Sequence, residues 1–236
     1  MSKHLKRLAA PVVLGIPRKT TVWVARSAPG PHPLERSVPL IKVLRDMLKY
    51  CDYADEGKKI IGSRKIHVDG KVVTDPKFPV GLMDVVSMPE TKEYYRMLLD
   101  VRGRLRLVKA TKEDAAWKLA RIENKCVVPG RKFQLNFHDG RNILIEKSQF
   151  KTGDVLKLGL PEQKILAHYE LGSGAVAMLI GGQHVGELAT IKEYHIRRGT
   201  EPNIVQFNEG FTTVKENVFV VGKGTTEVKM PEVALL

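Results

Sequence analysis

The fold of this chain is decided by residues 40–88, LIKVLRDMLKYCDYADEGKKIIGSRKIHVDGKVVTDPKFPVGLMDVVSM. In the first part of this stretch, apolar residues recur at helical spacing and predict a short helix: Leu40, Val43, Leu44, Met47, Leu48 and Cys51. Lys42, Arg45 and Lys49 fall on another side of the same helix. We therefore expect a helix with one packing face and one charged face.

A second short helix is predicted downstream, with Asp55 and Glu56 in its first turn and Gly62 at its end. Four cations follow along it: Lys58, Lys59, Arg64 and Lys65. A hairpin comes next, because IHV and KVV flank Asp69-Gly70, a pair suited to a type I′ turn. Two small helices packed on a hairpin, with cations on one surface, form a shape that can lie against folded RNA.

The order of these elements resembles the RNA-binding fold first known from ribosomal protein four. The resemblance is carried by GSRKIHVDGKVV at 62–73 and GLMDVV at 81–86. Translation factors and RNA-modifying enzymes also carry this fold. The stretch alone therefore indicates RNA binding and leaves the class of protein open.

Charge points to the same kind of partner. The chain has 236 residues, of which 43% are hydrophobic, so it can bury a core in two or three compact units. Its net charge is +13, and residues 1–74 contribute +9 of it, with 15 Lys and Arg against 6 Asp and Glu. A merely solvated basic surface predicts a more even spread. We therefore expect a polyanion as partner.

Residues 1–39 combine six prolines with basic residues, and the first acidic residue is Glu35. Proline fixes φ and removes a donor, so we expect an extended basic arm that follows phosphates and orders on RNA. A flexible tail without function is the alternative. Trp23 argues against a wholly loose tail, because a large ring usually packs on something, either protein or a base.

The middle of the chain predicts mainly strands. Strands are expected at 94–99, 105–108, 125–128, 132–137, 142–146 and after Gly153-Asp154, with turn dipeptides between them. Thr111 and Asp114 form a capping-box pattern that predicts a helix running to about Ala120 and carrying Trp117. A small β barrel or sandwich is the expected result.

The stretch AVAMLIGGQHVGELATI at 175–191 resembles a KOW motif, in which a glycine-rich turn joins two strands. Gly181, Gly182 and Gly186 match that pattern, whereas Glu187 and Ala189 depart from it, since a basic residue and a glycine are common there. Strands at 204–207, 211–215 and 217–221 would complete a small barrel, followed by a loose tail from residue 222.

No motif typical of catalysis or metal binding occurs in the sequence. The seven histidines include no i, i+4 pair, and Cys51 and Cys126 are isolated, so we predict no metal site, no cofactor and a reduced intracellular setting. No phosphate-binding glycine loop or membrane-spanning run occurs. Asp139 in HDGRN could serve an RNA-modifying enzyme, but Asp139-Gly140 fits a hairpin turn better. We predict no small-molecule substrate.

Taken together, SKHLKRLAAP at 2–11, PLIKVLRDMLKY at 39–50, DGKVVTD at 69–75 and the glycine-rich turn are similar to the family of small-subunit ribosomal protein four of the archaeal and eukaryotic type. This resemblance covers essentially the whole chain. It implies a non-enzymatic, structural constituent of the cytoplasmic ribosome that contacts ribosomal RNA of the small subunit and neighbouring ribosomal proteins. An RNA-modifying enzyme, or a translation or transcription factor, is the alternative.

The expected fold class is α+β, mainly β. The expected segments are a basic arm (1–39), a helix-hairpin RNA-binding domain (40–93), a central β domain (94–171), a KOW-type barrel (172–222) and a tail (223–236). The predicted RNA contacts are Lys3, Lys6, Arg7, Arg18, Lys19, Lys42, Arg45, Lys49, Lys58, Lys59, Arg64 and Lys65. About 6 to 10 phosphate contacts would lower the affinity for RNA by roughly 10³ to 10⁵ between 50 and 200 mM salt.

Overall fold

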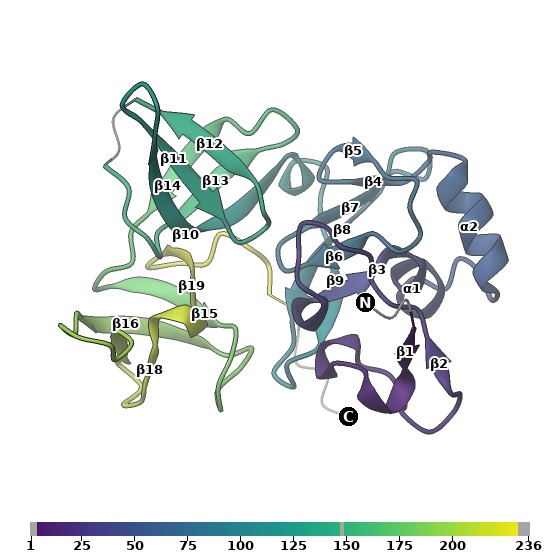
Figure 1. Cartoon of the computed structure of the whole chain (residues 1–236), viewed down its shortest axis with the longest axis horizontal. Coiled ribbons are helices and arrows are strands. Elements are labelled where there is room, and N and C mark those ends of the chain that lie inside the picture. The colour runs from purple at the N-terminus through teal and green to yellow at the C-terminus, as the bar shows by residue number, and fades with distance from the viewer. Residues whose placement is uncertain (1–3, 147–148, 231–236) are drawn as a thin grey trace. The chain divides into compact units, whose positions relative to one another are not determined.

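The computed structural model describes residues 4–146 and 149–230 (Figure 1). Two compact units are present: Met1–Leu98 with Arg104–Lys118, and Leu99–Gly103 with Leu119–Leu236. Strands far outnumber helices in both, as Figure 1 shows, so the predicted mainly β class is confirmed.

Both predicted helices of the first unit are present. The first begins as α1 (Leu40–Lys42) and continues as a π-helical segment, Val43–Met47, in which the Leu48 amide donates to the Val43 carbonyl over 3.0 Å. The second is α2 (Ala54–Gly62). The two helices pack closely because Gly57 has no side chain: a Cβ there would lie 2.4 Å from the Ile41 Cδ1 atom.

An antiparallel sheet with the strand order β5-β4-β7-β8-β9 completes this unit. Its strands are β4 (His67–Val68), β5 (Lys71–Val72), β7 (Val85–Met88), β8 (Glu93–Leu99) and β9 (Leu105–Lys109). Asp69 and Gly70 have φ values of +51° and +75°, as the predicted type I′ turn requires. Because β8 pairs with β7, the domain boundary expected after residue 93 falls inside this sheet.

The described part of the N-terminal segment is not an extended arm. β1 (Leu5–Lys6) pairs with β2 (Trp23–Val24), and 3-10 turns form at Arg7–Ala9, Val12–Leu14 and Leu34–Arg36. Leu14 is buried, and β3 (Ser37–Pro39) pairs with β6 (Pro79–Gly81). The prediction of an unpacked strap is therefore wrong for these residues, because they form strand pairs and bury the side chains of Ala10 and Leu14.

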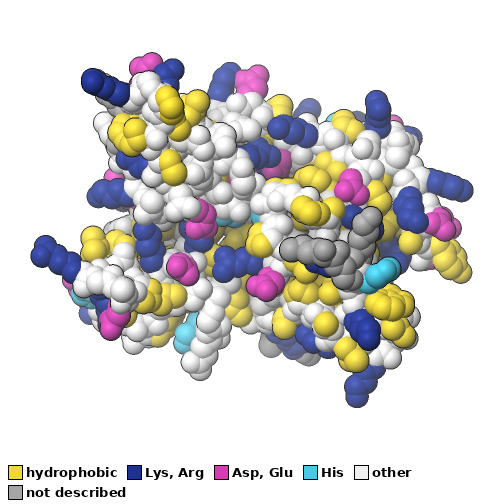
Figure 2. Space-filling model, in the orientation of Figure 1, with side chains coloured by type: hydrophobic (Ala, Val, Ile, Leu, Met, Phe, Trp, Pro, Cys, Tyr) yellow, Lys and Arg dark blue, Asp and Glu magenta, His cyan; other side chains and the backbone are white. Residues whose placement is uncertain are grey.

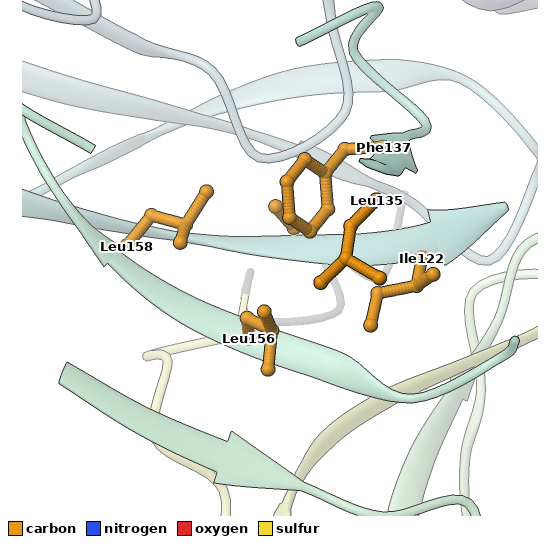
Figure 3. Packing of buried hydrophobic residues seen from close by; sticks show 6 residues of the cluster. Ile122, Leu135, Phe137, Leu156 and Leu158 are labelled. Carbon is orange, nitrogen blue, oxygen red and sulfur yellow. The ribbon is translucent and has the colours of Figure 1, made fainter. Parts of the chain in front are cut away.

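The central sheet of the second unit has the order β12-β11-β10-β13-β14. Its strands are β10 (Trp117–Val128), β11 (Lys132–Phe137), β12 (Asn142–Ile145), β13 (Val155–Gly159) and β14 (Ile165–Tyr169). Its core is apolar, and in Figure 3 the side chains of Ile122, Leu135, Phe137, Leu156 and Leu158 point toward one another. The strand β14 was not predicted.

The helix predicted from Thr111 to Ala120 is wrong. The capping contact exists, because the Thr111 hydroxyl donates to the Asp114 carboxylate over 2.8 Å, but it caps only a 3-10 turn at Asp114–Ala116. The Arg96 guanidinium accounts for the early end: it donates to the carbonyls of Asp114, at 2.6 Å, and Trp117, at 2.9 Å. In a continuing α-helix, the Asp114 carbonyl would instead accept a hydrogen bond from a backbone amide of the next turn.

A second sheet, with the order β18-β17-β16-β15-β19, follows. Its strands are β15 (Ala175–Leu179), β16 (Leu188–His195), β17 (Ile204–Phe207), β18 (Thr212–Val214) and β19 (Val218–Lys223), close to the predicted positions. The loose tail is wrong up to residue 230, because the Glu227 amide donates to the Val221 carbonyl over 3.0 Å and Val228 is buried. Residues 231–236 lie outside the described residues.

Within the described residues, none of the helices is both long enough and apolar enough to cross a membrane.

Candidate nucleic-acid interface

Helix α2 and the turn after it carry the four exposed cations that the sequence predicts there, Lys58, Lys59, Arg64 and Lys65. Lys58 pairs with Asp55 and Lys65 with Glu90, each over 2.8 Å. Lys59 and Arg64 form no salt bridge with any residue that the structure describes. Arg64 also takes the left-handed conformation that ends the helix, with φ of +64°, so Ser63 and Arg64 close α2 after Gly62.

Of the three predicted cations of the first helix, Lys49 is exposed, Arg45 is half-exposed and Lys42 is buried. Arg45 pairs with Asp46 over 2.7 Å, and this hydrogen bond raises the pKa of the guanidinium. Lys49 is exposed in the left-handed region, at φ of +58°. Tyr50 and Tyr53, which follow it in the chain, are also exposed, and the sequence analysis did not single them out.

Lys42 is not on an exposed charged face. Its side chain is buried, and its ammonium donates to the Leu14 carbonyl. Burial lowers the pKa of Lys42 to about 8, with smaller opposing and reinforcing effects from neighbouring charges. The predicted position on the charged side of the helix is therefore wrong, because the folded N-terminal segment covers that side of α1.

The predicted contacts of the N-terminal segment have mixed settings. Lys6 and Lys19 are exposed, whereas Lys3 lies outside the described residues. The Arg7 guanidinium donates to the Pro17 carbonyl over 3.1 Å, and the Arg18 guanidinium donates to the Leu8 carbonyl over 2.9 Å. Both arginines therefore hold the loop between β1 and β2 in shape.

On the face shown in Figure 2, Lys and Arg side chains are spread over the surface with Asp and Glu side chains between them. No single basic block stands out in that view, so the interface has to be located from the setting of each cation.

A buried ionic cluster, which the sequence analysis missed, supports the first unit from inside. The Lys118 ammonium lies 2.7 Å from Asp69 Oδ2 and 2.8 Å from Asp84 Oδ1, and all three side chains are buried. Asp84 Oδ2 lies 3.0 Å from His32 Nε2 and accepts from the Gly81 amide over 2.9 Å. Desolvation alone would raise the pKa of Asp84, but His32 and Lys118 outweigh it and hold that pKa well below its usual range.

This cluster fixes the hairpin turn that follows the two helices. Asp69 also accepts from the Val85 amide over 2.9 Å, so one carboxylate ties the turn to β7 and to Lys118. The ion pairs of this cluster join residues that are 34 to 52 positions apart in the chain, which explains why spacing did not reveal them. In the sequence, the only hints of this cluster were a charged residue within each of two apolar stretches: Asp84 in GLMDVV and Lys118 in WKLA.

The glycine-rich turn between β15 and β16 has the backbone that its glycines allow. Gly182 and Gly186 have φ values of +87° and +82°. A Cβ on Gly181 would lie 2.6 Å from the Asn217 Oδ1 atom, and one on Gly186 would lie 2.4 Å from the Asp100 carbonyl oxygen. At these glycines the close neighbour is protein.

Asp139 belongs to a hairpin turn, as the sequence predicts. The Phe137 amide donates to the Arg141 carbonyl over 2.9 Å, and Gly140 has φ of +73°. The Asp139 carboxylate is buried 3.2 Å from the Arg141 guanidinium. Among the described residues, no group of three or more His, Cys, Asp or Glu side chains is arranged to hold a metal ion.

Three family models match successive parts of the chain. The RS4NT domain matches residues 1–35, the S4 domain matches residues 38–86, and the ribosomal family S4e matches residues 91–165. The S4 match covers α1, α2, β4, β5 and the start of β7, and it ends before β8 and β9. The cations of α2 therefore lie in a recognised RNA-binding domain of the ribosomal protein four type.

Curated relatives match over nearly the whole chain. Small ribosomal subunit protein eS4 of Methanocaldococcus jannaschii is 47% identical, over 97% of both chains, and that of Methanothermobacter thermautotrophicus is 44% identical, over 97% of this chain and 96% of the relative. The crystal structure of 30S ribosomal protein S4e from Thermoplasma acidophilum is similar, with a TM-score of 0.70 and 38% identity over 80% of this chain and 96% of that one. This chain therefore belongs to the ribosomal family S4e.

Proposed function

We propose that this protein is a structural constituent of the small ribosomal subunit and binds ribosomal RNA through its first unit. The observation that carries the proposal is the set of exposed cations on and after α2, within the S4 domain, of which Lys59 and Arg64 are without an ion pair among the described residues. The relatives that match nearly the whole chain are named as small-subunit proteins.

We propose electrostatic contacts between protein cations and RNA phosphates, which recognise the shape of the RNA backbone and not its base sequence. Cations that touch phosphates release counterions, and double-helical RNA hides its base edges in a deep, narrow groove. The candidate contact residues are Lys3, Lys6, Arg7, Arg18, Lys19, Arg45, Lys49, Lys58, Lys59, Arg64 and Lys65. The proposed phosphate contacts among the described ones are those whose charge has neither an ion pair nor a hydrogen-bonded carbonyl in the described residues: Lys6, Lys19, Lys49, Lys59 and Arg64. Lys42 is left out because its ammonium is buried.

The second unit is proposed to act as a protein scaffold in the cytoplasmic ribosome, next to other ribosomal proteins. Support comes from the glycine-rich, KOW-like turn, where Gly181 and Gly186 approach protein atoms of their own unit. Glu187, on the strand side of that turn, pairs with His184 over 2.9 Å and adds negative charge. Both features disfavour phosphate contact by the second half of the turn.

The test is a double charge reversal on α2 and its following turn. We expect Lys59→Glu with Arg64→Glu to weaken binding of the purified protein to small-subunit ribosomal RNA at least tenfold and to reduce the salt dependence, with unchanged circular dichroism. Lys192→Glu with Arg198→Glu is the matched control, since both residues are exposed, belong to the second unit and give the same change in charge. Equal effects of the two pairs would contradict the proposed surface.

A second experiment separates a constituent from an enzyme or a transient factor. The protein should remain at one copy per small-subunit particle after a wash in moderate salt, whereas a transient factor should be released. Incubation with structured RNA followed by mass spectrometry should leave every nucleotide unaltered. Turnover of the RNA, or loss from the particles, would overturn the proposal.

A further inference from the structure

Trp23 exposes a large ring in a segment that is folded. It is 56% exposed, although it lies in β2 and pairs with β1, where its Cα partner is Lys6. Exposed tryptophan is uncommon without a partner, because its ring buries a large apolar area when covered. The ring is therefore available to a partner molecule.

The loop between β1 and β2 is held in place before any partner binds. The Arg7 amide donates to the Val22 carbonyl over 2.9 Å, and the guanidiniums of Arg7 and Arg18 donate to carbonyls within the loop. A preformed support lowers the entropy that binding would otherwise cost. Trp23 is thus presented by a small closed structure.

The face that carries Trp23 combines aromatic rings with a cation. The His4 ring lies 5.5 Å from the Trp23 ring, centroid to centroid, at an angle of 51°. Lys6 projects from the same face, because directly opposed residues of an antiparallel pair share a face.

The charge around this face favours a polyanion over a protein surface. Residues 4–34 contain five Lys and Arg and no Asp or Glu. An aromatic ring among cations is the combination with which proteins hold unpaired nucleotides, since the ring stacks on the base while the cations meet the neighbouring phosphates. A base inside a duplex cannot serve, because its faces are already stacked.

We propose that Trp23 is a stacking platform for one unpaired base of the bound RNA, with Lys6 on an adjacent phosphate. This inference rests on the proposed binding of ribosomal RNA and adds to it a subsite for a single nucleobase outside the S4 domain. Stacking of this kind tolerates any base, because every base has a π face.

The two tryptophans of the chain allow a direct optical test. The central carbon of the Arg96 guanidinium lies over the Trp117 ring, 4.4 Å from the centroid of that ring. Trp117 therefore serves as an internal reference. The full-length protein is titrated with small-subunit ribosomal RNA of Methanocaldococcus jannaschii while tryptophan emission is recorded. We expect quenching in the wild type and in Trp117→Phe, and no quenching in Trp23→Phe.

Affinity gives an independent readout. Trp23→Ala should weaken RNA binding roughly 5- to 150-fold, the range for loss of one stacked base, with an unchanged salt slope because no cation is removed. Trp23→Phe should recover most of that affinity. Val22→Ala, a neighbouring exposed apolar residue, is the control and should bind like the wild type.

The outcomes separate this inference from the proposed function. If Trp23→Ala binds RNA as tightly as the wild type, and Trp23 emission is unchanged, the stacking platform is refuted while RNA binding stands. If Trp23→Ala binds free RNA normally but assembles poorly into particles, the ring contacts a protein, which also refutes it. If the wild type fails to bind ribosomal RNA at low salt, the proposed function itself fails.

Discussion

Replacing Lys118 by methionine should be among the most damaging single changes in the first unit. Its ammonium is fully buried between the carboxylates of Asp69 and Asp84, at 2.7 and 2.8 Å. Methionine has a similar length and carries no charge, so Lys118→Met leaves the buried carboxylates of Asp69 and Asp84 without the cation that lies between them. Taking one partner out of a buried ion pair exposes the full desolvation penalty of the other.

The expected loss in the free energy of unfolding is about 3–5 kcal/mol, the range measured for broken buried ion pairs. Typical domains are stable by only about 5–15 kcal/mol, so this loss is large enough to lower the denaturation midpoint markedly. Urea unfolding followed by circular dichroism and by tryptophan fluorescence measures it. The slope of the transition should stay the same, because the area exposed on unfolding is unchanged.

A triple variant supplies the control. Lys118→Met combined with Asp69→Asn and Asp84→Asn removes the whole set of charges and keeps oxygens that can accept from the Val85 and Gly81 amides. Because the triple variant leaves no uncompensated buried carboxylate in the cluster, it should regain part of the stability lost by the single variant. A single variant that unfolds at the wild-type urea concentration would refute the reasoning.

The pH dependence of the free energy of unfolding tests the same interaction. The folded-state pKa of Asp84 is depressed, so the wild type gains stability from this carboxylate above its unfolded pKa near 4 and loses it as the pH falls toward the folded value. In Lys118→Met the Asp84 carboxylate has lost that cation and protonates more readily. Its deficit relative to the wild type should therefore shrink as the pH falls below about 4, where the wild type loses this contribution.

Two further predictions concern one glycine and one lysine. Gly186→Ala should destabilise the second unit by more than about 2 kcal/mol in urea unfolding, because a Cβ would lie 2.4 Å from the Asp100 carbonyl oxygen. Gly174→Ala is the control for the backbone cost alone, since Gly174 has a similar φ of +79° and no atom lies within 4 Å of the added Cβ. Equal losses of stability in the two variants would contradict the contact argument. The free energy of unfolding of the wild type should rise relative to that of Lys42→Met as the pH rises from about 8 to 10.5. In that window the unfolded chain binds more protons than the folded one, because burial lowers the folded-state pKa of Lys42. Parallel pH profiles of the two proteins would show that the Lys42 ammonium is not desolvated.

Features encoded within a few residues could be predicted from the sequence. The apolar spacing in residues 40–48 and the acids at the start of α2 located both helices, and Asp69-Gly70 located the hairpin turn. Turn dipeptides likewise placed most strands of both later sheets. In each case the decisive interaction joins residues that are neighbours in the chain.

Features that depend on distant partners could not be predicted. The capping pattern at Thr111 is present, but Arg96, 18 residues before Asp114, takes the carbonyl that a longer helix would need. The cluster around Lys118 joins positions that are tens of residues apart, and so does the bond from Lys42 to Leu14. Propensity and pattern describe what a segment prefers, and a tertiary partner overrides that preference.

The same limit applies to the basic residues, and it changes the expected strength of RNA binding. Of the twelve predicted contacts, Lys42 is buried, Arg7 and Arg18 donate to carbonyls, and three others already form salt bridges. The remaining described ones, without an ion pair to any described residue, are Lys6, Lys19, Lys49, Lys59 and Arg64.

Five phosphate contacts predict a slope of log affinity against log salt of about −3.5 to −4.5, and hence a loss of roughly 100- to 500-fold in affinity between 50 and 200 mM salt. This is weaker than the 10³ to 10⁵ expected from 6 to 10 contacts, because part of the positive charge of the first unit is used to hold its own fold together. Net charge thus predicts the class of partner, whereas the number of contacts follows only from the setting of each side chain.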